Sequence, residues 1–170
     1  AGRVYAFEAL PANAERIRRN IALNGFERRI HLVSQAVANK SGELTFYVHA
    51  SVGMGKLAGS AGRREEQYQA EITVPTLALD EFVYQQGNPP PQVVKMDIEG
   101  GEVLALPGMK RILAEHHPLL LLELHGPESE KVAWETLTAA GYRLHEMANG
   151  YPPIESPEKL GWKAYVIAKP

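Results

Sequence analysis

Two acidic residues that stand two positions apart, Asp97 and Glu99, are the first candidates for chemistry in this sequence. They follow the apolar run 93–96, which is typical of a buried strand, and Gly100 and Gly101 come directly after them. Side chains two positions apart on a strand point to the same side. The pair could therefore hold a cationic ligand, position a hydroxyl group and take up its proton, or bind a metal. The structural alternative is that the acids favour the N-terminus of a following helix.

Two further polar side chains stand at the ends of apolar runs. Glu8 follows residues 4–7, and a carboxylate there could accept hydrogen bonds from both hydroxyl groups of a ribose; alternatively, it is a solvated acid before a helix. His125 follows residues 119–124 and could accept a proton near neutral pH, or it could be structural. Glu123 lies within that run, where an unpaired carboxylate would be costly to bury, so it is either a site residue or an ion-paired one.

Strand-like and helix-like segments alternate along the chain and would position these groups. The predicted strands are residues 4–7, 30–33, 44–48, 72–77, 93–96, 119–124, 142–147 and 164–168, and the predicted helices are 12–23, 79–84, 101–116 and 128–140. Pro107 should bend or interrupt the third of these helices. The alternation predicts an α/β fold in which 4–7, 30–33, 93–96 and 119–124 are parallel strands of one sheet, and the last two strands form a hairpin. Ligands of such sheets bind beyond the carboxyl ends of the strands.

Composition narrows the class of protein. The 170 residues are 45% hydrophobic and 22% charged, which fits one globular domain over residues 1–170. The formal net charge of -2 gives no general attraction to nucleic acid or anionic membranes. The absence of cysteine excludes disulfides, thiolate metal sites and cysteine nucleophiles. No apolar stretch is long enough to span a bilayer and no signal peptide is visible, so we expect a cytoplasmic protein.

Five segments of the chain resemble, in the same order, the FkbM family of class I S-adenosylmethionine-dependent methyltransferases. They are Val-Tyr-Ala-Phe-Glu-Ala-Leu-Pro at 4–11 with Leu-Asn at 23–24, then 37–48, 74–82, Lys-Met-Asp-Ile-Glu-Gly-Gly-Glu at 95–102, and 106–108. The first is similar to the family's V-x-A-F-E-P-x-P followed by N-x-x-L-N, with Ala9 in place of the first proline. The segment 95–102 is similar to K-I-D-V-E-G-x-E and is the most specific of the five.

The resemblance implies a Rossmann-like class I methyltransferase fold, with a mostly parallel sheet and an antiparallel strand near the C-terminus. It also implies S-adenosylmethionine as the cofactor, with Glu8 on its ribose, Asp97 and Glu99 at its methionine end and the acceptor, and its adenine near Ser34, Gln35 and Ala36. The family's first strand and its D-x-G-A-N-x-G loop would precede Val4. The resemblance therefore implies an N-terminally truncated domain, in which the strands 4–7 and 93–96 do not pair directly.

The reaction that we expect is O-methylation of a hydroxyl group on a small molecule or glycan. Because the sulfonium is already a good electrophile, catalysis needs mainly alignment, together with a proton acceptor for the hydroxyl. Asp97, Glu99 or His125 could be that acceptor, and we assign no metal ligand. The glycine-rich loop 51–62 is the expected lid on the acceptor side. The alternative hypothesis is a catalytically silent module that binds a nucleotide-like ligand or a protein partner.

Overall fold

The computed structural model describes residues 2–51, 55–62 and 68–170. Its strands are β1 (Val4–Phe7), β2 (Ile30–Val33), β3 (Ala36–Val37), β4 (Gly42–His49), β5 (Lys56–Leu57), β6 (Tyr68–Leu77), β7 (Val93–Met96), β8 (Leu119–His125), β9 (Arg143–Glu146) and β10 (Lys163–Lys169). Its helices are α1 (Pro11–Leu23), α2 (Leu79–Tyr84), α3 (Glu102–Ala105), η1 (Leu106–Met109), α4 (Lys110–His116), α5 (Pro127–Ala139) and η2 (Pro157–Lys159). No helix in these ranges has the length and apolar composition needed to cross a bilayer.

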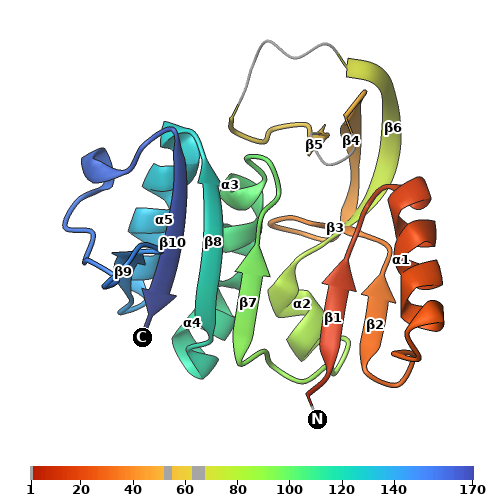
Figure 1. Ribbon diagram of the computed structural model, residues 1–170, viewed down its shortest axis with the longest axis horizontal. Helices are drawn as coiled ribbons and strands as arrows, with labels where there is room; N and C mark the ends of the chain where they lie inside the picture. Colours follow the sequence, from red (N-terminus) through yellow and green to blue (C-terminus); the bar gives the residue numbers. More distant parts are fainter. Residues whose placement is uncertain (1, 52–54, 63–67) are drawn as a thin grey trace.

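The strands form three sheets rather than the one mostly parallel sheet that the sequence predicted (Figure 1). β1 pairs in parallel with β2, and β7 pairs in parallel with β8, so the direction within each predicted pair is confirmed. A third sheet has the order β3-β6-β4-β5, and its long strands β4 and β6 are antiparallel. The prediction of one sheet is wrong because, among the described residues, β1 and β2 pair only with each other, whereas β7 and β8 belong to the separate sheet β7-β8-β10-β9. In the third sheet, β4 and β6 satisfy the backbone groups of each other in a register of eight residue pairs.

The C-terminal strands agree better with the sequence prediction. β10 lies between β8 and β9 and is antiparallel to both, so the hairpin and the antiparallel strand near the C-terminus are confirmed. Among the described residues β1 pairs only with β2, and β7 only with β8. The two strands therefore do not pair with each other, as the resemblance implied.

The helices begin and end where local chemistry requires. Pro11 opens α1, where its missing N–H costs nothing, and Gly25 after the helix has a φ of +66°, a conformation that glycine adopts without strain. The predicted helix 101–116 is divided into α3, η1 and α4, because Pro107 cannot donate the hydrogen bond that would continue the first turn. The sequence predicted this interruption correctly.

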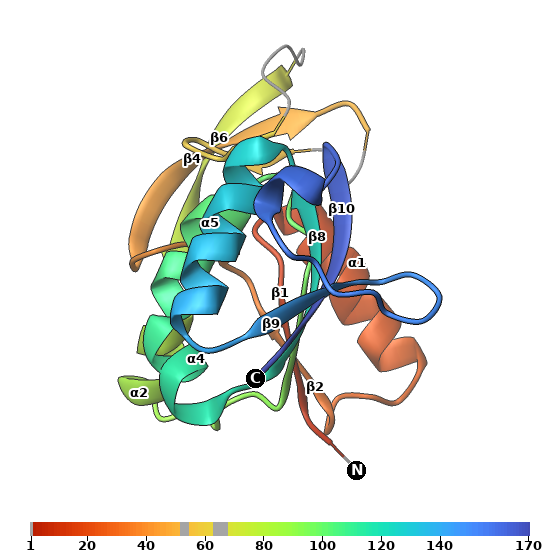
Figure 2. The ribbon, with the colours of Figure 1, turned by 90° about the vertical axis from the view of Figure 1, so that its left-hand side faces the viewer.

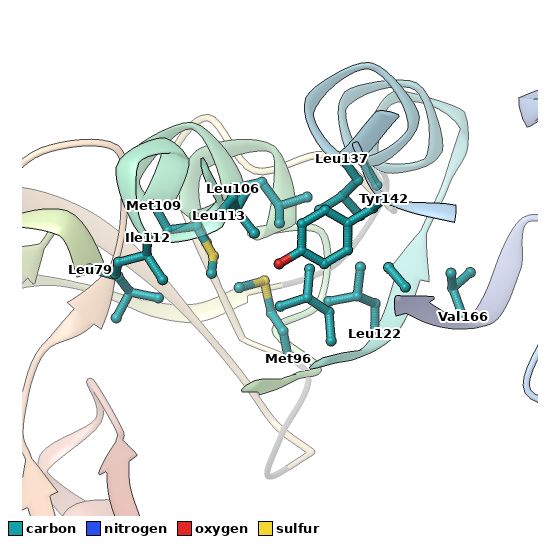
Figure 3. Packing of buried hydrophobic residues seen from close by; sticks show 14 of the residues in the cluster. Leu79, Met96, Leu106, Met109, Ile112, Leu113, Leu122, Leu137, Tyr142 and Val166 are labelled. Atoms are coloured by element: carbon teal, nitrogen blue, oxygen red, sulfur yellow. The ribbon is translucent and has the colours of Figure 1, made fainter. Parts of the chain in front are cut away.

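The main core lies between the β7–β8–β10 sheet and the helices η1, α4 and α5. Figure 2 shows α4 and α5 on one side of β8 and β10, with α1 on the opposite side. In Figure 3, Met96, Leu122 and Val166 point from the strands toward Leu106 and Leu137 on the helices. All of these side chains are buried, and each contributes about 1.5–3 kcal/mol on burial. This packing fixes the strand ends from which the polar candidates project.

Candidate functional site

A cavity of about 210 Å³ is lined by residues that follow β1, β2 and β7 and by residues of the loop that carries β5. Figure 1 shows where these strands end. Five of the residues that the sequence assigned to a site line it: Glu8, Gln35, Ala36, Asp97 and Glu99. These residues are up to 91 positions apart in the sequence. They come together because β1, β2 and β7, although they belong to two sheets, all end at this cavity, and ligands of α/β folds bind beyond the carboxyl ends of the strands.

Glu8 is held in place at the end of β1. Its Oε1 accepts a hydrogen bond of 2.8 Å from the backbone N–H of Leu10, and its Oε2 lies 3.5 Å from the Nδ2 of Asn13. The first of these contacts is strong, whereas the second is at the limit for a hydrogen bond. The carboxylate is therefore oriented before any ligand arrives, and Asn13, which also lines the cavity, is a site residue that the sequence reasoning did not assign.

The three residues assigned to the adenine are placed differently from one another. Ala36 is buried in β3 and lines the cavity, and Gln35 lines it while its Nε2 lies 3.5 Å from the carbonyl oxygen of Thr76. Ser34 is not among the lining residues; its Oγ accepts a hydrogen bond of 2.9 Å from Arg18 on the exposed side of α1. The geometry thus supports Gln35 and Ala36 as lining residues and leaves Ser34 outside the cavity wall.

Asp97 and Glu99 lie in the turn between β7 and α3 rather than on the strand, because β7 ends at Met96. Asp97 is exposed, and its Oδ2 is 3.4 Å from the Nζ of Lys95. Glu99 has a φ of +51°, a left-handed conformation that is uncommon for residues other than glycine. Such strain persists only where the surrounding structure imposes it, and it is frequent at functional sites. Both carboxylates reach the cavity through this turn and not through the strand alternation that the sequence suggested.

His125 is the last residue of β8, and its side chain is only 3% exposed. Its Nδ1 lies 3.5 Å from Glu102 Oε1, and its Nε2 lies 3.3 Å from Glu123 Oε1 and 3.8 Å from Glu99 Oε2. The contact with Glu102 is the main cause that raises the pKa of His125; burial opposes the rise, and the charges of Glu99 and Glu123 add to it. An imidazole with a raised pKa is favoured in its protonated form, which has no lone pair to accept a further proton.

Glu102 is a buried residue beside the site, and the sequence pointed to it only as the last residue of the 95–102 motif. It is fully buried, its Oε1 accepts a hydrogen bond of 3.2 Å from the N–H of Ile98, and its Oε2 accepts one of 3.0 Å from Ser129 Oγ. A buried carboxylate needs such partners to offset its lost hydration. Glu102 therefore joins the turn after β7 to α5 and to His125.

The loop of residues 55–62 closes one side of the cavity. Gly55, Lys56, Leu57 and Ser60 line it, and the N–H of Ala61 donates a hydrogen bond of 2.9 Å to the carbonyl oxygen of Gly100. The Oγ of Ser60 is buried and has no hydrogen-bond partner among the described residues, which makes it available to a ligand. The position of the loop suits the expected lid over 51–62, whose residues 52–54 lie outside the described residues; its closing motion remains a prediction.

Gly100→Ala is expected to destabilise the protein more than Gly141→Ala. The two glycines have nearly equal φ values of +90° and +86°, so alanine suffers the same backbone strain, of about 1–2 kcal/mol, at either position. A Cβ at position 100 would lie 2.2 Å from the carbonyl oxygen of Ala61, whereas a Cβ at position 141 meets nothing within 4 Å. The clash should add about 1–3 kcal/mol. Urea unfolding of both variants measures the difference, and equal losses would contradict the close contact between the loop and Gly100.

Comparisons with known proteins point to one family. Residues 1–144 match the family model of the methyltransferase FkbM domain. The structure is similar to the crystal structure of methyltransferase FkbM from Methylobacillus flagellatus KT, with a TM-score of 0.56 and 15% sequence identity. The similarity covers 99% of this chain but only 36% of that chain, and at this identity it supports the fold alone. No curated protein matches the sequence.

Proposed function

We propose that this chain, which belongs to the FkbM methyltransferase family, transfers a methyl group from S-adenosylmethionine to a hydroxyl group of a small molecule or glycan. Membership of the family rests on the match over residues 1–144 of 170. The observation that carries the proposal is the cavity that brings Glu8 together with Asp97 and Glu99. The matches do not favour the alternative of a catalytically silent module. The single domain over 1–170 and the cytoplasmic location remain predictions from the sequence.

The cavity wall suits a nucleoside-containing cofactor. Glu8 presents an oriented carboxylate, as the two hydroxyl groups of a ribose require. Apolar side chains from separate elements, Phe7 and Phe46 among them, offer surfaces for a flat base beside Ala36. Gln35 and the Oγ of Ser60, which has no hydrogen-bond partner within the described ranges, add polar groups that could fix its orientation. When it is bound, S-adenosylmethionine would supply an electrophilic methyl group.

The two carboxylates of the turn after β7 would carry out the steps that involve the acceptor. Asp97 and Glu99 would align the acceptor hydroxyl and receive its proton, which is the one proton transfer that O-methylation needs. His125 lies behind Glu99, at 3.8 Å, and its raised pKa favours the protonated state. In the metal-free protein we therefore assign proton uptake to the carboxylates and a supporting position beside Glu99 to His125.

Glu8→Ala is expected to weaken the binding of S-adenosylmethionine about 10- to 100-fold. The carboxylate would make charge-assisted hydrogen bonds to the ribose, whose loss costs about 1.5–3 kcal/mol. Isothermal titration calorimetry on the purified protein measures the dissociation constant directly. Glu27→Ala, which removes an exposed acid that does not line the cavity, is the control and should leave binding unchanged.

Two results would contradict this part of the proposal. Unchanged affinity in the Glu8→Ala variant would remove Glu8 from the cofactor site. If the wild-type protein does not bind S-adenosylmethionine at all, the cofactor assignment itself fails. Because Glu8 also accepts the hydrogen bond of Leu10, the thermal unfolding of each variant should be compared so that lost folding is not read as lost binding.

A further inference from the structure

Three possible metal ligands converge beside the cavity. One ligand atom from each of Asp97, Glu99 and His125 lies within 4.8 Å of the other two. Carboxylate oxygens and imidazole nitrogens bind divalent metals at about 2.0–2.2 Å, so a single ion can be shared by atoms up to about 4.4 Å apart. Glu99 Oε2 and His125 Nε2, at 3.8 Å, already satisfy that condition. A small side-chain rotation would bring all three atoms to one ion.

The burial and the hydrogen bonding of the His125 side chain independently indicate a bound ligand. Its side chain is 3% exposed, yet within the described part of the chain neither ring nitrogen has a hydrogen-bond partner. Buried polar atoms are almost always paired, so this exception calls for an explanation. The Nε2 lies 3.3 Å from Glu123 Oε1 and 3.8 Å from Glu99 Oε2, and on the side of Glu99 a metal would supply the missing partner.

The groups behind His125 match those that support a metal-binding histidine. Glu102 Oε1 lies 3.5 Å from Nδ1, and Glu102 is itself oriented by the N–H of Ile98 and the hydroxyl of Ser129. A carboxylate placed at the far nitrogen of a histidine directs the other nitrogen toward the metal, and this arrangement recurs in metalloproteins.

The charges around the imidazole are also unbalanced. Asp97, Glu99, Glu102 and Glu123 surround it, and only Asp97 and Glu123 have a lysine partner, Lys95 and Lys163 respectively. Within the described ranges no lysine or arginine forms an ion pair with Glu99 or Glu102. A divalent cation would compensate the two carboxylates that lack a lysine.

From this geometry we propose that Asp97, Glu99 and His125 form a binding site for a divalent first-row transition-metal ion, such as Mn²⁺. Two oxygen ligands and one nitrogen ligand suit such ions, and three protein ligands leave positions open for other molecules. The histidine binds in its neutral form, so the ion replaces a proton on the ring. A role for the ion rests on the proposed methyl transfer: at the cavity wall it would bind the acceptor hydroxyl and lower its pKa.

The test is a titration of Mn²⁺ into the full, chelator-treated protein, followed by calorimetry and by electron paramagnetic resonance. We expect one bound ion per chain. Affinity should fall at least about tenfold in Asp97→Asn, Glu99→Gln and His125→Gln, since even the partners of metal ligands affect affinity by that much. The controls Glu27→Gln and His145→Gln, an exposed acid and a histidine on β9 outside the cluster, should bind Mn²⁺ as the wild type does.

The outcomes separate clearly. No bound Mn²⁺ in the wild type, or equal binding in the wild type and in the folded Asp97→Asn and Glu99→Gln variants, would overturn the proposal. Because His125 is buried, the His125→Gln variant could fail to fold, and the Asp97→Asn and Glu99→Gln variants would then still test the proposal. Circular dichroism reports whether each variant is folded. Because the titration contains no S-adenosylmethionine, its result is independent of the cofactor binding measured for Glu8, and either proposal can fail without the other.

Discussion

Asp97→Asn and Glu99→Gln are each expected to lower the rate of methyl transfer about 10²–10⁴-fold at saturating S-adenosylmethionine. That range is the usual loss when a positioned acid or base is removed. Both substitutions keep the shape of the side chain, but an amide accepts a proton far less readily than a carboxylate. The carboxylates line the same cavity as Glu8, and the strained backbone of Glu99 indicates that its position is imposed by the surrounding structure.

The measurement is transfer of a labelled methyl group to a panel of simple hydroxyl compounds, phenols and sugars included, alongside the affinity for S-adenosylmethionine. A fall in turnover with unchanged cofactor affinity would support the proposed role at the acceptor. A fall in affinity alone would assign the pair to the methionine end of the cofactor. Full rate and affinity with lower thermal stability would show that the pair is structural. Glu27→Gln is the matched control and should keep wild-type turnover.

The same two variants also distinguish a proton acceptor from a metal ligand. If the carboxylates act only on the proton, Mn²⁺ affinity should not follow turnover across the variants. If they hold a cation that acidifies the acceptor, turnover and Mn²⁺ affinity should fall together, and added Mn²⁺ should restore part of the activity of Asp97→Asn. Lys95, whose Nζ lies 3.4 Å from Asp97 Oδ2, also places a positive charge beside the carboxylates. If that charge alone acted on the acceptor, added Mn²⁺ would not change the turnover.

The convergence of the cavity residues could be predicted because it follows from strand direction alone. Glu8 and Asp97 each come after a short apolar run, and parallel strands place such residues at one edge. The arrangement of sheets could not be predicted in the same way. β4 and β6 are separated in the chain by residues 50–67, and their local pattern does not indicate whether they extend the parallel strands or form a separate sheet.

The positions of the buried site residues were harder to predict from the sequence. A glutamate at the start of a helix, such as Glu102, is normally explained by the helix dipole, and only the fold shows that it is fully buried against His125 and Ser129. His125 was expected to follow a strand, but it is the last residue of β8 and faces three carboxylates. Such contacts depend on side-chain packing across elements, which hydrophobic periodicity does not encode.

Glu102→Ala is expected to lower the free energy of unfolding by about 3–5 kcal/mol, the usual cost of removing one partner from a buried ion pair. The substitution leaves the N–H of Ile98 and the hydroxyl of Ser129 without their acceptor in the interior, and it removes the carboxylate that lies 3.5 Å from the Nδ1 of His125. Each unsatisfied buried group adds to the loss, and the vacated volume adds a cavity. Because one side chain serves three elements, the effect should exceed that of any exposed acid in the chain.

Urea unfolding at neutral pH measures this loss, and two variants make it specific. Glu102→Gln keeps an acceptor for Ile98 or Ser129 but loses the charge beside His125, so it should cost less than alanine does. Glu135→Ala, on the exposed side of α5, should change the unfolding free energy by no more than about 0.5 kcal/mol. If Glu102→Ala were as mild as Glu135→Ala, the three contacts would be too weak to hold the turn after β7. The orientation of Glu99 and Asp97 at the cavity would then have to come from other contacts of the turn, such as the hydrogen bonds from Ala61 to Gly100 and from Gly101 to Ile98.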